Sequence, residues 1–243
     1  MSFNPVNKVF DTVQSHAYEV SMSLSGTLTK IALLLATLAI GAGGAWYLFS
    51  QNIMVGPLLI GSLISAVLLS FATVFWPHIA RFTAVPYALS EGICLGMISS
   101  IFEIKAPGIA VLAVTLTGAT ATAMLLLYRL GIIKVTETFK AVIFSATAGI
   151  ALTYGVLMLA GLFGAKTASF FTSSSWVSIG FSLFVVAIAA FNLLIDFQRI
   201  EDGVERELPQ YMEWYSAFSI LVTLVWLYLE ILRLLMKLSA RKD

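Results

Sequence analysis

Three carboxylic acids stand out because each lies within a run of apolar residues. They are Glu91 in "YALSEGICLG", Asp196 in "NLLIDFQR" and Glu230 in "WLYLEILR". An ionised carboxylate in hydrocarbon is costly, so such a residue usually faces a protein interior and marks a functional site. Two acids that share a site of low dielectric cannot both ionise cheaply, so together they hold a proton near neutral pH. When both are charged, the pair can coordinate a hard cation.

Each acid also has a basic residue nearby in the sequence with which it could simply form an ion pair. The pairs are Asp196 with Arg199, Glu91 with Arg81, and Glu230 with Arg233. Glu91 could instead cap backbone amides, and Glu230 could reach outward to the lipid headgroups. The residue pattern therefore leaves two roles open for each acid, a titrating switch and a structural ion pair.

The elements that must position these acids follow from the composition. The chain has 243 residues, of which 59% are hydrophobic and only 11% are charged, whereas about 25% of residues in soluble domains are charged. Residues 31–80, 106–128 and 141–165 contain no Asp, Glu, Lys or Arg. A helix needs about 20 apolar residues to cross the hydrocarbon core of a bilayer. We therefore predict an all-α, polytopic membrane protein.

Seven predicted transmembrane helices account for the apolar runs. They cover residues 31–49, 53–76, 84–102, 107–128, 141–163, 176–195 or beyond, and 214–238. Pro86, Pro107 and Pro209 fall near predicted helix starts, where a missing N–H costs little. Gly203 suits a helix C-terminus, so the sixth helix is expected to extend to Asp202.

The first 29 residues are predicted to be a polar N-terminal segment, and residues 30–243 a seven-helix transmembrane domain. The segment lacks the apolar core of a cleaved signal peptide. Its apolar residues favour a short amphipathic helix on the membrane surface, and a partly ordered tail is the alternative. These residues are Val6, Val9, Phe10 and Val13.

The orientation of the chain is predicted from Lys and Arg, which are enriched in cytoplasmic loops. With a cytoplasmic N-terminus, the inner loops hold most of the basic residues. The inner set is Arg81, Arg129, Lys134, Lys140, Arg199 and Arg206, and the outer set is Lys105 and Lys166. The basic residues from Arg233 onward oppose this rule, because a seventh crossing carries them outside. We predict a cytoplasmic N-terminus and seven spans.

Several classes of function are disfavoured by the composition. The single cysteine, Cys94, excludes an intrachain disulfide and disfavours a metal cluster, so we expect no metal site and no cofactor. A net charge of +1 gives no electrostatic footprint for nucleic-acid binding. His16 and His78 both lie outside the predicted helices, so a Ser–His intramembrane protease would lack its base. The chain is not expected to be an enzyme, and no catalytic residue is assigned.

Small residues cluster in several of the predicted helices. They occur as "GAGGA" at 41–45, Gly92 and Gly96 four residues apart, "TGATATA" at 117–123 and "SATAG" at 145–149. Such faces let helix backbones approach closely in a membrane. Packing within one bundle is the favoured interpretation, and a dimer contact is the alternative.

Four segments together resemble the Bax inhibitor-1 superfamily, and especially its bacterial YccA-like branch. They are "VPYALSEGICLGMISSIFE", "LLLYRLGIIKVTETFK", "FVVAIAAFNLLIDFQRIEDGV" and "YMEWYSAFSILVTLVWLYLEILRLLMKL". The resemblance runs from about residue 25 to the end of the chain. It implies a seven-helix fold in which the last helix is central and surrounded by the other six. It also implies a location in the bacterial inner membrane.

The resemblance further implies a pH-sensitive calcium leak, which is attributed to some members of the superfamily. In these members an acidic pair between the sixth and seventh helices holds the pore closed and opens on a change of protonation. Asp196 matches the sixth-helix acid. Glu230 resembles the seventh-helix acid, with Glu in place of the usual Asp.

The spacing of Asp196 and Glu230 is wider than this acidic pair implies. If the turn between the last two helices is centred near residue 206, the two acids are offset by about 21 Å along antiparallel helices. Residues 213–219 would then lie opposite Asp196. Glu213 becomes a rival partner for Asp196, and Ser216 or Ser219 becomes a possible hydrogen-bond donor.

Two functions of different classes follow as hypotheses. The first is a pH-gated cation leak pathway, with calcium as a permeant ion, lined by Asp196 and Glu230. Asp196 would be the titrating latch, and its partner would be Glu230, Glu213 or Glu91. The second is a non-conducting membrane protein that binds and modulates a membrane protease or another membrane partner. Its contact surface would be the acidic "IEDGVERE" segment together with the N-terminal segment.

Overall fold

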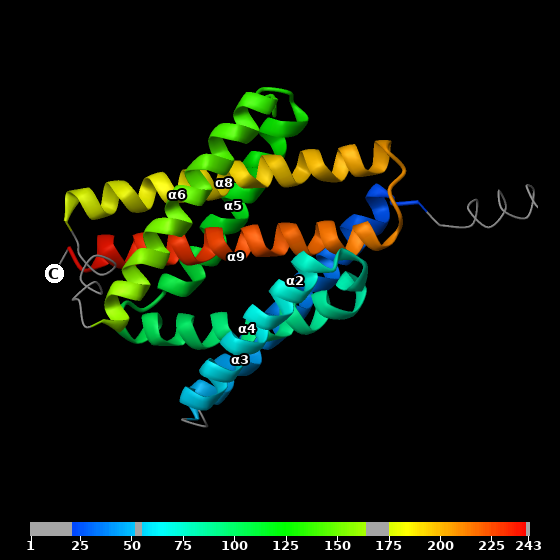
Figure 1. Ribbon diagram of the computed structural model, residues 1–243. Coiled ribbons are helices and arrows are strands. Elements are labelled where there is room, and N and C mark those ends of the chain that lie inside the picture. Colours follow the sequence, from blue (N-terminus) through cyan, green and yellow to red (C-terminus); the bar gives the residue numbers. More distant parts are fainter. Residues whose placement is uncertain (1–20, 52–54, 164–174, 242–243) are drawn as a thin grey trace, which may run out of the picture.

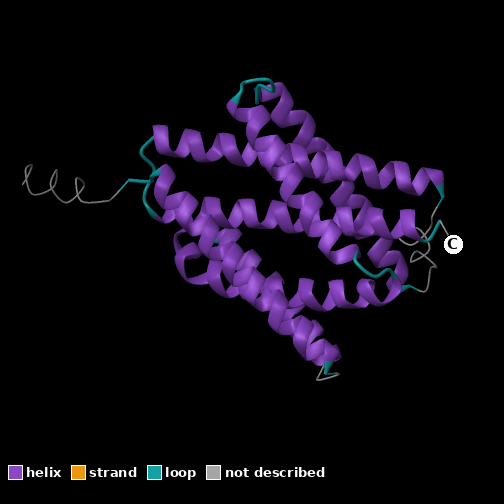
Figure 2. Cartoon of the chain, turned by 180° about the vertical axis from the view of Figure 1, so that it is seen from behind, coloured by secondary structure: helices purple, strands orange, loops and turns teal. Residues whose placement is uncertain are grey.

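The computed structural model describes residues 21–51, 55–163 and 175–241, and within these ranges all regular elements are helical. In this described part, seven helices are long and apolar enough to cross a membrane. They are α2 (Leu24–Ser50), α3 (Val55–Phe75), α4 (Ala80–Lys105), α5 (Ile109–Arg129), α6 (Glu137–Leu162), α8 (Trp176–Glu205) and α9 (Tyr211–Ser239). A short 3-10 helix, η1 (Pro77–Ile79), precedes α4. Figures 1 and 2 show this all-helical bundle from two sides, and the predicted fold class is confirmed.

Large apolar side chains cover the outer faces of these helices. Ile40 in α2, Ile104 in α4 and Phe144 in α6 each expose 72% of their surface. A soluble protein rarely exposes a continuous apolar surface of this kind. Hydrocarbon is the solvent that suits this surface, so the chain is a multi-pass integral membrane protein.

The last helix, α9, lies at the centre of the bundle, as the resemblance implies. It packs against α2, α4, α5 and α8, while α3 packs on α4 and α6 packs on α8. Figure 1 shows α9 running between α8 and the group formed by α2, α3 and α4. Its buried side chains, such as Leu221, Leu227 and Leu232, belong to the hydrophobic core. Because α9 contacts several helices, a movement of one of them can be transmitted to the others through α9.

Glycines allow α2 and α4 to pack very closely. A Cβ atom added to Gly92 or Gly96 of α4 would collide with the backbone carbonyl of Leu38 or Ala42 in α2. In turn, a Cβ atom on Gly41 would lie 2.7 Å from the carbonyl oxygen of Leu89. These small residues therefore serve packing within one bundle, which is the favoured interpretation of their pattern.

Two predicted helix boundaries are wrong. Pro86 was expected near a helix start, but α4 already begins at Ala80, so Pro86 lies inside the helix. Gly203 was expected to end the sixth helix, but α8 continues to Glu205. Gly203 is instead buried against Met22, because a Cβ atom there would lie 2.9 Å from the Met22 sulfur. The absence of a side chain at Gly203 lets Met22 approach α8 closely.

The first transmembrane helix begins earlier than predicted. Ser23 is the N-cap of α2, and its side chain accepts a hydrogen bond from the Gly26 amide. Helix therefore covers part of the segment expected to be a polar lead-in. The predicted amphipathic surface helix falls in residues 1–20, outside the described residues.

The two ends of the bundle differ in what they carry. At one end, which we call the N-terminal end, the Met22 amide donates a hydrogen bond of 2.7 Å to the Leu208 carbonyl. Ser21 forms an isolated antiparallel bridge with Pro209. Residues 21–23, which we call the strap, thus lie against the connection between α8 and α9. The opposite, C-terminal end carries Ser239 at the end of α9.

Candidate functional site

Asp196 lies inside α8 and exposes only 5% of its surface. Two hydroxyl groups from α9 hold its carboxylate. Ser219 Oγ donates to Oδ1 at 2.8 Å, and Thr223 Oγ1 donates to Oδ2 at 2.6 Å. Ser219 and Thr223 are one helical turn apart, so both face the same point on α8. The carboxylate thereby joins the sixth and seventh spans.

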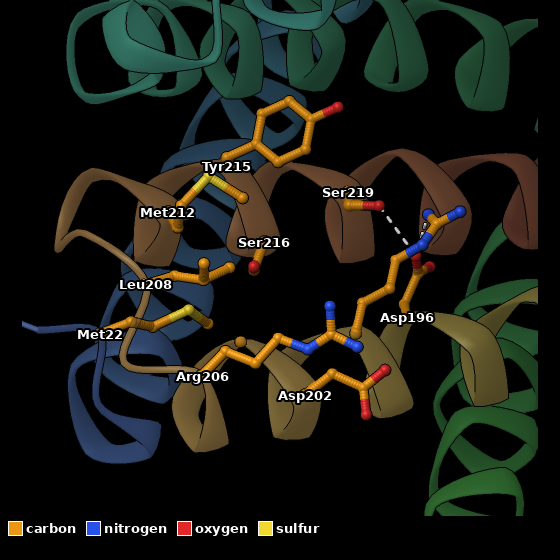
Figure 3. A pocket seen from close by; sticks show the side chains of 11 residues that line it. Met22, Asp196, Asp202, Arg206, Leu208, Met212, Tyr215, Ser216 and Ser219 are labelled. Atoms are coloured by element: carbon orange, nitrogen blue, oxygen red, sulfur yellow. Dashed lines mark hydrogen bonds and ion pairs between the residues drawn. The ribbon is translucent and has the colours of Figure 1, made fainter.

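A pocket of about 210 Å³, lined by charged, hydroxyl and apolar side chains, adjoins this carboxylate at the N-terminal end of the bundle. Arg199 Nη1 lies 3.5 Å from Asp196 Oδ1, and the Arg199 side chain is largely exposed. Asp202 of α8 and Arg206, which follows the end of α8, extend along the same pocket (Figure 3). Met22 of the strap lines the pocket as well. Asp196 is thus buried among helices but adjoins a cavity whose lining includes side chains of both charge signs.

The sequence predicted some of these contacts and missed one. The ion pair with Arg199 and the hydrogen bond from Ser219 both form. Ser216, the other predicted donor, lines the pocket. Thr223 was not anticipated. The signal that could have found it is the pair of hydroxyl residues Ser219 and Thr223, spaced four apart in an otherwise apolar helix.

Glu213 is buried in the first turn of α9 and holds the start of α2. The Ser23 amide and hydroxyl donate to Glu213 Oε1 at 2.8 and 2.9 Å. Lys30 of α2 forms a close ion pair with Glu213 Oε2. The Lys30 ammonium also lies 5.4 Å from the centre of the Trp214 ring. Glu213 is therefore neutralised by α2 and is not a partner of Asp196.

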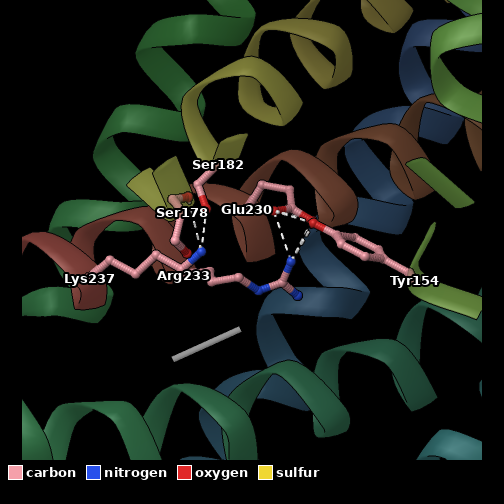
Figure 4. A network of polar contacts seen from close by, with 6 residues as sticks. All are labelled: Tyr154, Ser178, Ser182, Glu230, Arg233 and Lys237. Atoms are coloured by element: carbon pink, nitrogen blue, oxygen red, sulfur yellow. Dashed lines mark hydrogen bonds and ion pairs between the residues drawn. The ribbon is translucent and has the colours of Figure 1, made fainter. Parts of the chain in front are cut away.

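Glu230 belongs to a separate polar network farther along α9, shown in Figure 4. Arg233 Nη1 donates to both of its carboxylate oxygens at 2.9 Å. The Tyr154 hydroxyl of α6 donates to the same oxygens at 3.0 and 3.2 Å. Arg233 also donates to the Tyr154 oxygen at 2.7 Å. The predicted alternative for Glu230, an ion pair with Arg233, forms, and it ties α6 to α9.

Lys237 extends this network toward the C-terminal end of the bundle. Its ammonium donates to the Ser178 carbonyl at 3.3 Å and to Ser182 Oγ at 2.8 Å. A Ser–Lys pair can act as nucleophile and base in some hydrolases. Ser182 and Lys237 expose only 1% and 3% of their surfaces, however, so a substrate could not reach the hydroxyl. We interpret the pair as a tie between α8 and α9.

Glu91 is half-buried in α4. Among the described residues it forms neither a hydrogen bond nor an ion pair, so the predicted contact with Arg81 is not made. It does not line the pocket beside Asp196. Its role as a gating partner stays a prediction without a contact in its support.

The structure does not bring Asp196 and Glu230 together. Thr223 marks the level of Asp196 on α9, and Glu230 lies seven residues beyond it, or about 10 Å along the helix axis. Glu213 lies six residues before Ser219, about 9 Å away in the other direction. The buried acids of α8 and α9 thus occupy three separate levels, each with its own partners.

No group of three or more His, Cys, Asp or Glu side chains that could hold a metal ion occurs in the described ranges. Cys94 is buried in α4 as a free thiol. The candidate site is therefore Asp196 with its hydroxyl donors and its pocket, and the chemistry available there is proton binding by the carboxylate.

Comparison with known proteins decides the family. A family model described as "Bax inhibitor 1 like" matches residues 4–240. The chain belongs to the Bax inhibitor 1 like family. Neither the curated proteins nor the solved structures include a match to the chain. The predicted resemblance to the superfamily is confirmed, and its bacterial YccA-like branch stays a prediction.

The family match places Asp196 and Glu230 in context. Both acids fall inside the matched range, so this Bax inhibitor 1 like chain carries acids in its last two spans. Opposite Asp196, however, α9 presents Ser219 and Thr223 in place of a second carboxylate. A site with one acid and two hydroxyls has a single titrating group at its centre.

Proposed function

We propose that this Bax inhibitor 1 like protein is a cation leak pathway, permeable to calcium, that is gated by a proton on Asp196. The observation that carries the proposal is the contact of one buried carboxylate with two hydroxyls across the α8–α9 interface, beside a pocket that charged side chains help to line. A buried ionisable group in a membrane span is a functional-site candidate by default. Such a group can couple proton binding to helix contacts.

The ionised form of Asp196 would hold the pathway closed. Its two oxygens accept one hydroxyl hydrogen bond each from α9, and Arg199 balances the charge. A proton on Asp196 would occupy one oxygen and remove the attraction to Arg199. Thr223 Oγ1 already lies 3.1 Å from the Ser219 carbonyl, so it has another acceptor within reach. Protonation would therefore loosen the tie between α8 and α9.

The charged groups around Asp196 come mainly from α8. They are Arg199 and Asp202 of α8 and Arg206 just after its end, and the phenol of Tyr215 from α9 also lines the pocket. Asp202 accepts a hydrogen bond of 2.7 Å from Gln198. A cation that enters this pocket meets Asp202 first and Asp196 deeper in the bundle. Glu230 as a second acid of the pathway stays a prediction, since Arg233 now neutralises it.

Calcium flux into vesicles tests the latch. The purified protein would be reconstituted into liposomes that contain a calcium-sensitive dye, and flux would be measured from pH 5 to 8. We expect flux to rise as the pH falls, because the proton releases the tie. Asp196→Asn carries no titrating proton at this position, so its flux should lose the pH dependence.

Two further variants sharpen this test. Thr223→Val keeps the shape of the side chain but removes one donor, so flux at neutral pH should rise above that of the unaltered protein. Glu137→Gln changes an acid at the start of α6 that is 90% exposed, so its pH profile should not change. If Asp196→Asn retains both the flux and the pH dependence of the unaltered protein, the latch does not exist.

A second candidate function is a non-conducting regulator that binds a membrane protease at the N-terminal end. The observation in its favour is that the strap and the α8–α9 connection form one joined surface through backbone hydrogen bonds. Removal of residues 1–20 leaves Ser23 and its contacts with Glu213 in place. We expect this truncation to abolish co-purification with the protease, and vesicles with the full-length or the truncated protein should show no calcium flux above that of empty vesicles. A truncated protein that still captures the protease would remove this candidate.

A further inference from the structure

An apolar groove of about 770 Å³ lies between α2 and α5. Its walls come from residues 35–46 of α2 and 110–122 of α5, and its floor comes from α4 and α9. The two walls are not in close contact, since α2 packs on α4 and α9 while α5 packs on α8 and α9. The volume lies within the range of ligand pockets, about 300–1,000 Å³. The groove is independent of the Asp196 pocket, with which it shares no residue.

The hydroxyl groups that line the groove do not need a ligand. Its hydroxyl groups donate to backbone carbonyls of their own helices, as in Thr115 to Val111 at 2.9 Å and Thr122 to Gly118 at 2.8 Å. On the floor, Ser99 Oγ donates to the Leu95 carbonyl. Thr117 and Tyr228 are satisfied by Ala113 and Ser99, at 2.7 and 2.6 Å. Because these hydroxyls already have hydrogen-bond partners within the protein, the surface suits contact with hydrocarbon. It cannot replace the hydration shell of an ion.

The position of the groove identifies its occupant. Both of its walls belong to helices that span the membrane, so the groove lies at the depth of the lipid acyl chains. Trp46, near the end of α2, lines the groove close to the start of α5 at Ala110. Tryptophan is enriched at the level of the lipid headgroups. A chain that enters beside Trp46 would come from the leaflet at the C-terminal end of the bundle.

We propose that this groove is a binding site for one acyl chain of a phospholipid. The chain fills the space between α2 and α5, which pack on the same central helix without packing on each other. In hydrocarbon an unfilled groove loses van der Waals contacts on both walls. The bound lipid thus completes the packing between the α2 side and the α5 side of α9.

Four glycines provide matched variants for a test. Gly43 and Gly118 line the groove, and a Cβ atom on either meets nothing within 4 Å. Gly44 and Gly149 are equally open but do not line the groove. A leucine at Gly43 or Gly118 would occupy groove volume, whereas a leucine at Gly44 or Gly149 would extend elsewhere. All four changes replace a helical glycine, so their effects on helix propensity are alike.

Native mass spectrometry would count the phospholipids that the purified protein retains in mild detergent. We expect the unaltered protein, Gly44→Leu and Gly149→Leu to retain one phospholipid. Retention by Gly43→Leu and Gly118→Leu should fall by about tenfold or more. Equal retention by groove and control variants would overturn the proposal. An unaltered protein that retains no phospholipid would also overturn the proposal. If the unaltered protein is a dimer and only the groove variants dissociate it, the occupant is a second copy of the chain, and the proposal is again overturned.

Photochemical labelling in vesicles gives a second readout that does not depend on detergent. A phospholipid with a photoreactive group in its acyl chain would label every lipid-facing helix to some extent. We expect peptides from the groove walls in α2 and α5 to be labelled more strongly than peptides from α3 and α6. Gly118→Leu should remove this excess and Gly149→Leu should keep it. Uniform labelling of all helices in the unaltered protein would count against a defined site.

Discussion

Three buried acids in the last two spans are stabilised in three different ways. Asp196 accepts hydrogen bonds from two hydroxyls and has a largely exposed arginine nearby. Glu213 has a lysine and the N-cap of α2, and Glu230 has an arginine and a tyrosine. Glu213 and Glu230 thus each have a close cation, whereas the two shortest contacts of the Asp196 carboxylate are with hydroxyls. This contrast makes Asp196 the better candidate for a switch.

The ion pair between Lys30 and Glu213 provides a prediction at the scale of single residues. Lys30→Met would leave a buried carboxylate without its cation, so we expect a loss of about 2–3 kcal/mol in the free energy of unfolding. In the Lys30→Met background, the further change Glu213→Met should lower the free energy of unfolding by less than it does in the unaltered protein. The reason is that in this background it also removes the uncompensated charge. Chemical denaturation in detergent micelles, followed by circular dichroism, measures both quantities.

The Glu137 and Lys140 pair is a suitable control for this cycle. It joins two residues near the start of α6 with an exposed carboxylate, at an N–O distance of 3.0 Å. Exposed pairs contribute about 0–1 kcal/mol, so Lys140→Met should change stability much less than Lys30→Met. Equal losses from the two variants would show that the Lys30 pair does not fasten α2 to α9.

At the scale of elements, the bundle consists of helix pairs joined by different means. The α2–α4 pair depends on glycines that permit backbone contact. The α8–α9 pair depends on polar ties at two levels, Asp196 with Ser219 and Thr223, and Lys237 with Ser182. Glycine contacts are rigid because they require close packing, whereas hydrogen bonds to a carboxylate respond to its charge. Movement on proton binding is therefore expected at the α8–α9 interface.

The rigid pair gives a prediction for Gly92. Gly92→Ala would place a Cβ atom against the Leu38 carbonyl, so α2 and α4 must separate. We expect a loss of about 1–3 kcal/mol in the free energy of unfolding. Gly149→Ala, in open space on α6, should instead gain up to about 1 kcal/mol from helix propensity. Thermal unfolding of both variants in the same detergent separates the two effects, and a neutral Gly92→Ala would contradict the close α2–α4 packing.

At the scale of the whole molecule, seven spans place the two ends of the described chain on opposite sides of the membrane. The strap and the end of α8 lie at the N-terminal end, and the end of α9 lies at the other. Three charged side chains, Glu230, Arg233 and Lys237, lie in the last three turns of α9 and are partly or fully buried. Two of the basic residues that oppose the rule for loop charges, Arg233 and Lys237, therefore bind groups inside the bundle. They do not act as loop charges, and the cytoplasmic N-terminus stays a prediction.

Labelling of single cysteines would test this orientation. In a Cys94→Ser background, Glu205→Cys reports on the N-terminal end and Arg241→Cys on the C-terminal end, since both positions are exposed. In intact cells an impermeant maleimide should label Arg241→Cys alone, and Glu205→Cys should react only after permeabilisation. The reverse pattern would mean that the chain is inserted the other way, and the same reactivity at both positions in intact cells would mean that the last helix does not cross.

The helices themselves could be predicted from the sequence, because a run of about 20 apolar residues in a membrane has to satisfy its backbone internally. The family could also be recognised, since its most specific segments contain Asp196 and Glu230. Helix ends were less certain. Pro86 and Gly203 resemble boundary signals, but tertiary contacts and an uninterrupted helical pattern outweighed those local preferences.

The partners of the acids were decided by the tertiary structure. The connection between α8 and α9 covers only residues 206–210, and its length sets which residues of α9 lie opposite Asp196. Spacing alone pointed to residues 213–219, which includes Ser219 but neither Thr223 nor the distant Glu230. Contacts with α2 and α6, which hold Glu213 and Glu230, join residues far apart in the chain. The sequence by itself identified Asp196 and Glu230 as buried acids, because each lies in a local apolar run, but it did not single out the buried Glu213, and Glu91 is only half-buried. Only the packing of the helices decided which groups neutralise them, because that depends on the register between segments that the local pattern does not specify.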